Sequence, residues 1–260
     1  MKKTVSLLLL FAIVLSLCAC GEVSPAPAES AAPTESAEPA ETPVPAQSDA
    51  PVASEAPAVP EDIVVTAYEK SGDYTDDLGN EYRYSYRVPA INADTEEAQR
   101  LNSLINEQLM SVVNEELSSM DGGLSLVSIN MDYRFFVNGG IVSILCKADS
   151  PNDFFNYWVY NYDAESGREI TRADFLAREG LTEDELVSLA CAACEKKFTE
   201  AFGGFPHDDF YDEQYARTLD PSTYGDDLML YYGEDGVLSM VAPIYSMAGA
   251  AFYYQELAVR

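Results

Sequence analysis

The composition of the chain changes abruptly near residue 60, and this change limits which part can fold. Residues 21–60 hold nine of the 14 prolines, no aromatic residue and no Lys or Arg. Such a stretch cannot bury enough apolar surface to offset the loss of chain entropy, so we expect it to stay unfolded. At ~3.1 Å per residue in an extended, proline-rich conformation, it would act as a spacer that reaches at most about 120 Å.

A signal peptide is expected at residues 1–20, before this linker. Lys2 and Lys3 form a positively charged start, and the apolar stretch at 5–17 is shorter than the ~20 residues of a membrane-spanning helix. The following LCAC resembles the lipobox of bacterial lipoproteins, which implies that Cys20 carries a lipid and that Cys18 is removed. The alternatives are ordinary cleavage nearby and an uncleaved anchor. In each case we expect the rest of the chain to be exported, and with a lipid on Cys20 we expect an extracytoplasmic protein anchored to the bacterial cell membrane.

Residues 61–260 are strongly acidic. They contain 37 Asp and Glu against 13 Lys and Arg, a net charge of about −24. A field of this sign repels nucleic acid and attracts cationic partners, so we expect no nucleic-acid partner. The alternative is that the charge only keeps the domain soluble.

Strand and helix patterns alternate along this acidic region. Runs at 63–70 and 81–88 predict a hairpin, and the spacing of apolar residues after Asp94 predicts a helix with Asp94 as its N-cap. A second helix is predicted from about Thr182 to Phe202, followed by an acidic, aromatic loop at 205–215.

Further strand-like runs predict an antiparallel meander and a closing pair of strands. The meander runs are at 126–137, 141–148 and 154–163, and the closing runs are at 228–243 and 250–259. The predicted class is therefore α+β, with antiparallel sheets and two main helices.

Little in the acidic region suggests chemistry. His207 is the sole histidine and has no nucleophile pattern nearby, so we expect a solvated or hydrogen-bonded loop residue. The acidic stretch at 73–81 does not match a calcium-binding loop, and we expect a polar turn there. Without a nucleophile, a metal cluster or a phosphate loop, the sequence predicts a protein that is not an enzyme and holds no metal or cofactor.

Cys191 and Cys194 form a C-x-x-C pattern in the middle of the predicted second helix, whereas redox pairs lie at a helix start. They share an apolar stripe with Val187 and Phe198, so we expect both to pack as small hydrophobic side chains. Together with Cys146 they leave an odd number of cysteines, which argues against a disulfide framework.

Three stretches resemble the RsiV-like extracytoplasmic domain and the companion module that precedes it. On this resemblance, the companion module occupies 61–123 and the C-terminal domain 124–260. The stretch at 160–190 matches the pattern of an aromatic strand, a Ser-Gly turn, Ile-Thr and a helix start, at Tyr162, Asp163, Ser166, Gly167, Ile170, Thr171, Asp174 and Phe175. The upstream and closing stretches match at Val88, Pro89, Ile91, Ala98, Leu101, Asn102, Ile105, Leu230, Tyr231, Asp235, Gly236, Val237, Pro243, Tyr245, Ala248 and Gly249.

The resemblance implies a non-catalytic α+β module, of the kind found in anti-sigma factors that sense lysozyme by binding it and beside polysaccharide deacetylase domains. We expect capture of a cationic protein such as a lysozyme-like wall hydrolase, with Asp235, Pro243 and Tyr245 in the contact loop. Only residues 1–4 precede the apolar stretch, so we do not expect transmembrane signalling. The alternative is a glycan-binding accessory module whose tyrosines stack on the sugar rings of peptidoglycan.

Overall fold

The computed structural model describes residues 59–150, 155–225, 228–248 and 251–260. The expected signal peptide, the lipid on Cys20 and the linker up to residue 58 lie outside these residues. From residue 59 onwards the described segments belong to one compact unit. Among them, no helix has both the length and the apolar character needed to cross a membrane.

The larger of two sheets has six strands that follow one another in chain order. It contains β1 (Val64–Thr75), β2 (Glu81–Ile91), β3 (Asn130–Asn138), β4 (Ile141–Asp149), β5 (Phe155–Asp163) and β6 (Arg168–Glu169). The predicted hairpin is the β1–β2 pair, and the predicted meander is β3–β4–β5. Both predictions are confirmed, since alternating side chains and the Asn138-Gly139-Gly140 turn are local signals.

The prediction of purely antiparallel sheets is wrong at one place. β2 and β3 pair in parallel, through Ser85 with Asn130 and Tyr86 with Met131. The parallel pair forms because α1 (Glu96–Asp121) connects the two strands as a crossover, which a hairpin cannot do. The module boundary expected at residue 123 falls within this crossover, so the two modules share one sheet.

Helix α1 covers one face of the larger sheet. It buries Ala98, Leu101, Ile105, Leu109 and Val113 at helical spacing. Its N-cap is Thr95 and not Asp94, because the Thr95 side chain accepts the Ala98 N–H at 3.1 Å. The prediction of Asp94 as the N-cap is therefore wrong, and so is the capping box that it would form with Glu97, three residues later.

The C-terminal part consists of a smaller antiparallel sheet and three helices. The strands are β7 (Met229–Tyr232), β8 (Leu238–Tyr245) and β9 (Phe252–Ala258), so the first closing run, at 228–243, spans two strands and the second gives one. The helices are α2 (Arg172–Glu179), α3 (Glu183–Phe202) and α4 (Asp209–Thr218), followed by the short 3₁₀ helix η1 (Pro221–Tyr224). Helix α3 confirms the predicted second helix, with Thr182 as its N-cap.

The described residues thus contain four α-helices, and the prediction of two main helices is wrong. The predicted loop at 205–215 contains most of α4. Asp208 caps this helix by accepting the Tyr211 N–H at 3.0 Å, and Tyr211, Gln214 and Thr218 form its buried face. This buried face is narrow and partly polar, and the rest of the stretch is acidic. The sequence pattern therefore did not predict a helix there.

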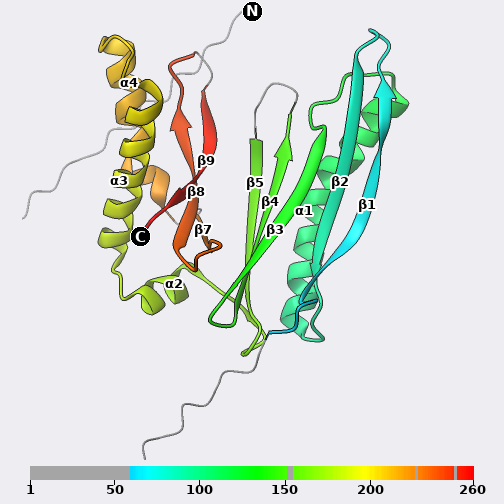
Figure 1. The fold of residues 1–260 in the computed structure, drawn as a ribbon, viewed down its shortest axis with the longest axis horizontal. Coiled ribbons are helices and arrows are strands. Elements are labelled where there is room, and N and C mark those ends of the chain that lie inside the picture. The colour runs from blue at the N-terminus through cyan, green and yellow to red at the C-terminus, as the bar shows by residue number, and fades with distance from the viewer. Residues whose placement is uncertain (1–58, 151–154, 226–227, 249–250) are drawn as a thin grey trace, which may run out of the picture. The chain divides into compact units, whose positions relative to one another are not determined.

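The elements form four layers: α1, the larger sheet, the smaller sheet, and α3 with α4 (Figure 1). The small sheet lies between two layers because successive side chains of β8 point to opposite faces of the sheet. Met240 and Ile244 face the core under α3, whereas Val241 packs toward Leu145 of the larger sheet. The small sheet is therefore buried on both faces over the middle of β8.

Candidate functional site

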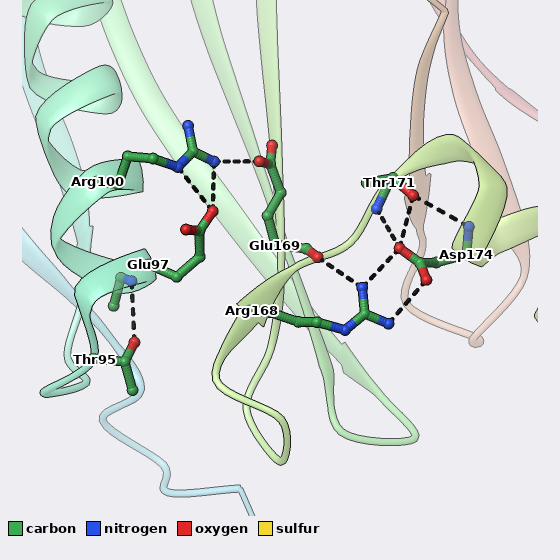
Figure 2. Close-up of polar contacts among 8 residues, drawn as sticks. Thr95, Glu97, Arg100, Arg168, Glu169, Thr171 and Asp174 are labelled. Atoms are coloured by element: carbon green, nitrogen blue, oxygen red, sulfur yellow. Dashed lines mark hydrogen bonds and ion pairs between the residues drawn. The ribbon is translucent and has the colours of Figure 1, made fainter.

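The residues at the centre of the RsiV-like stretch are engaged in holding the fold. Thr171 and Asp174 form a capping box at the start of α2, in which Asp174 accepts the Thr171 N–H at 2.8 Å. Arg168 donates two hydrogen bonds to the same carboxylate, at 2.8 and 2.9 Å (Figure 2). The Arg168 guanidinium and the Thr171 donors hold the pKa of Asp174 well below its usual range.

A second part of this network joins α1 to β6. Arg100 of α1 pairs with Glu97 one turn earlier and reaches Glu169 of β6 (Figure 2). Gly167 has a φ of 70°, and an added Cβ there would lie 3.1 Å from Thr95 at the start of α1. The motif residues therefore connect α1, β6 and α2, and much of their polar capacity is already used within the chain.

The three contact residues expected from the closing stretch do not come together. Asp235 is exposed in the turn between β7 and β8, whereas Pro243 and Tyr245 lie at the far end of β8. Since a strand rises ~3.3 Å per residue, the eight residues of β8 place the turn and Tyr245 on the order of 25 Å apart. Asp235 and Tyr245 therefore lie near opposite ends of β8.

Tyr245 belongs to a half-buried aromatic cluster built on three strands. It pairs across the sheet with Phe252, and their ring centroids are 5.7 Å apart. Phe252 contacts Tyr254 at 5.3 Å, which in turn lies edge-on to Tyr157 of β5 at 6.4 Å. We call Tyr157, Pro243, Tyr245, Phe252 and Tyr254 the β8–β9 aromatic cluster. The resemblance in the closing stretch pointed to Pro243 and Tyr245, and only the strand register adds the other three.

Helix α4 extends this cluster into an exposed, acidic surface. Arg217 of α4 places its guanidinium carbon 4.2 Å from the centre of the Tyr245 ring, and Thr218 accepts the Tyr245 N–H at 3.1 Å. At the other end of the helix, Phe205 and Phe210 are 44% and 42% exposed. We define the α4 surface as Phe205, His207, Asp208, Asp209, Phe210, Asp212 and Glu213.

The acidic side chains of the α4 surface have few cations to neutralise them. Ten of the 13 Lys and Arg side chains in residues 61–260 already form ion pairs within the chain. On α4, Glu213 forms an ion pair with Arg217 at 3.8 Å. Apolar rings surrounded by unneutralised carboxylates are typical of a surface that binds a positively charged protein.

His207 is exposed and stacks on Tyr211, with 4.1 Å between ring centroids. The expectation of a solvated residue outside the core is therefore confirmed. In the described residues, no group of three or more His, Cys, Asp or Glu side chains is arranged to hold a metal ion.

The thiols and the β1–β2 turn follow the sequence interpretation. Cys194 is buried in the core under α3 and Cys191 packs against it, as expected for small hydrophobic side chains. Burial raises the pKa of both thiols, that of Cys194 to about 11. The predicted polar turn is organised by Asp76, which accepts the Asn80 N–H at 2.8 Å and the Ser125 hydroxyl at 2.6 Å.

Comparison with known proteins adds no relative: no protein-family model matches the chain, and no curated protein matches it.

Proposed function

We propose that this protein is a membrane-anchored, extracytoplasmic binding lipoprotein that captures a cationic protein, such as a lysozyme-like wall hydrolase. The proposal rests chiefly on the α4 surface, where Phe205 and Phe210 are exposed among four carboxylates. Aromatic anchors supply most of the binding energy of protein interfaces, and a surrounding rim of one charge directs the encounter with a partner of opposite charge.

The β8–β9 aromatic cluster supports the same function. Its rings are half-buried and adjoin α4 through Arg217 and Tyr245. A partner that covers α4 would therefore meet further aromatic area at the end of β8. Pro243 and Tyr245 are the two residues that the RsiV-like resemblance and this geometry both favour.

The direct test is binding of residues 59–260 to a basic lysozyme at two ionic strengths. We expect binding at ~20 mM salt and a clear weakening at ~500 mM, since the Debye length falls from roughly 20 Å to about 4 Å. Undetectable binding at low salt would exclude this function for the lysozyme tested. Salt-independent binding to washed peptidoglycan would instead support the glycan-binding alternative.

Matched surface variants locate the contact. Changing Phe205 and Phe210 together to Ser removes both exposed rings of the α4 surface. The control changes Leu78 and Leu124 to Ser, which are 83% and 61% exposed near the β1–β2 turn. We expect the first variant to lose at least about tenfold in affinity and the control to bind normally.

The anchor is tested separately on the full chain. A lipid on Cys20 predicts that Cys20→Ser releases the protein from the membrane fraction, because the thiol that bears the acyl chain is missing. Cys18→Ser is the matched control and should leave the protein at the membrane. Mass spectrometry of the native protein without an acyl group would contradict the anchor and leave the binding function untouched.

A further inference from the structure

The edge of β5 is open along most of its length. β6 covers only Tyr162 and Asp163, and one further backbone bond joins the Ile170 N–H to the Asn161 carbonyl at 3.0 Å. Among the residues that the structure describes, no backbone partner is found on the outer side of β5 between Phe155 and Tyr160. This edge is a row of backbone donors and acceptors available for pairing.

The register shows which residues present these groups. Because the Asn161 carbonyl points outward to Ile170, alternation along an antiparallel ladder turns the N–H and C=O groups of Val159, Tyr157 and Phe155 to the same side. The pairing of β5 with β4 runs without a shift from Phe155 to Asp163. An added strand would therefore meet a regular edge of three residues.

The other long edge strands carry features that hinder strand addition. β1 has an irregular register between Thr66 and Tyr68 and then the charged pair Glu69 and Lys70. β9 carries Glu256, and β7 has only four residues. β5 from residue 155 to 162 has no charge, no proline and no bulge. Natural sheets protect their free edges with charges, prolines, bulges or short strands. An edge without these features is a template on which another strand can pair.

A pocket of about 370 Å³ lies beside this edge. Val159 and Asn161 of β5 form one wall. The rest of the lining is mixed, with the apolar side chains of Ile170, Phe175, Leu228, Met229 and Leu230 and the polar side chains of Glu169, Thr171 and Arg172. The Arg172 side chain is fixed in the pocket lining, because it donates hydrogen bonds to Glu183 and to the carbonyls of Tyr224 and Gly225. A strand added to β5 could insert one apolar side chain into this pocket.

We propose that the β5 edge and this pocket bind an extended, proline-free segment of a cationic partner by β-strand addition. Backbone pairing would supply affinity, and the pocket would select one apolar side chain. The negative charge of the domain favours a basic segment over a second copy of this chain, because two copies of about −24 each repel one another. The β5 edge shares no residue with the α4 surface, and its Tyr157 side chain also belongs to the β8–β9 aromatic cluster.

The test uses residues 59–260 and a fluorescent synthetic peptide of alternating valine, threonine and leucine with paired lysines at both ends. A matched peptide has proline in place of alternate residues and cannot donate along the edge. We expect the first peptide alone to bind, with a Kd on the order of 100 µM. Hydrogen exchange should show protection of the Tyr157 and Val159 amides in the complex.

Two pairs of variants examine the edge and the pocket. Val159→Pro removes an outward N–H and leaves the ladder to β4 intact, and Val159→Thr keeps that N–H. Glu169→Trp, at the rim of the pocket, narrows its mouth with little demand on the core, and Glu169→Gln is its control. We expect Val159→Pro and Glu169→Trp each to weaken peptide binding by about tenfold, and both controls to bind as the wild type does.

The proposal is overturned if the lysine-flanked peptide does not bind, if both peptides bind equally, or if the folded Val159→Pro and Glu169→Trp variants bind it normally. Protection of amides elsewhere, without Tyr157 and Val159, also overturns it. Binding that persists when Phe205 and Phe210 are both changed to Ser shows that the β5 edge acts independently of lysozyme capture. The tests of the β5 edge and of the α4 surface are thus independent, and a negative result for one does not decide the other.

Discussion

The guanidinium of Arg217 lies over the ring of Tyr245, with its carbon 4.2 Å from the ring centre. Because Arg217 also pairs with Glu213 at 3.8 Å, this contact joins the acidic side of α4 to the β8–β9 aromatic cluster. A cation–π contact at an exposed site contributes ~0.5–1 kcal/mol, so it orients the tyrosine more than it stabilises the fold.

We predict that Tyr245→Ala weakens the capture of a basic lysozyme by about tenfold, because the ring that joins the aromatic cluster to α4 is lost. Tyr245→Phe keeps the ring and its contact with Arg217, so it should bind nearly as well as the wild type. Biolayer interferometry at low salt measures both affinities. Equal binding by the Ala variant would remove Tyr245 from the contact surface.

Asp76 should make the stability of the domain depend on pH. Its carboxylate accepts hydrogen bonds from Ser125, Asn80 and Tyr82, and these bonds hold its pKa well below the usual range in the folded state. The folded-state pKa is depressed, so the stabilisation is present above the unfolded pKa of about 3.9 and is lost as the pH falls below it.

Asp76→Asn should therefore lower the thermal midpoint at pH 7, and the difference from wild type should shrink as the pH falls from about 5 to about 2. Circular dichroism melts across this range measure the effect. Asp77→Asn is the control, because it changes the exposed neighbour in the same turn. A difference that stays constant with pH would mean that Asp76 acts through packing and not through its charge.

The Arg168, Thr171 and Asp174 network at the start of α2 should act on stability and leave partner binding unchanged. Asp174→Ala removes the capping box and the partner of Arg168, and we expect it to cost about 1–2 kcal/mol of unfolding free energy. The matched control is Asp184→Ala, in the first turn of α3, where Thr182 and Glu185 form the capping box instead. Urea titration measures stability, and a selective loss of lysozyme affinity in Asp174→Ala would contradict a structural role.

Cys194 should be almost unreactive in the folded protein. Burial raises its pKa to about 11, so only about one thiol in ten thousand is ionised at pH 7. We expect iodoacetamide to label it slowly in buffer and rapidly in urea, with mass spectrometry resolving Cys191 from Cys194. Fast labelling of the folded protein, or a disulfide between the two under mild oxidation, would point to a redox role.

Local patterns were enough to predict β1 with β2, the β3–β5 meander and α3. Alternation with period two, helical spacing and glycine turns act over a few neighbouring residues, so the sequence alone indicates them. The same logic placed Cys191 and Cys194 in a core. Local patterns did not predict α4, because its narrow buried face lies within an acidic stretch.

The sequence by itself determined most of the strands, the helices α1 and α3, and the acidic charge of the domain. Tertiary structure alone decided that β2 and β3 pair in parallel, that Asp235 lies far from Tyr245, and that Arg217 meets that ring. The physical reason is that strand pairing and side-chain contacts across layers depend on packing between residues far apart in the chain, and no local period in the sequence encodes those distances.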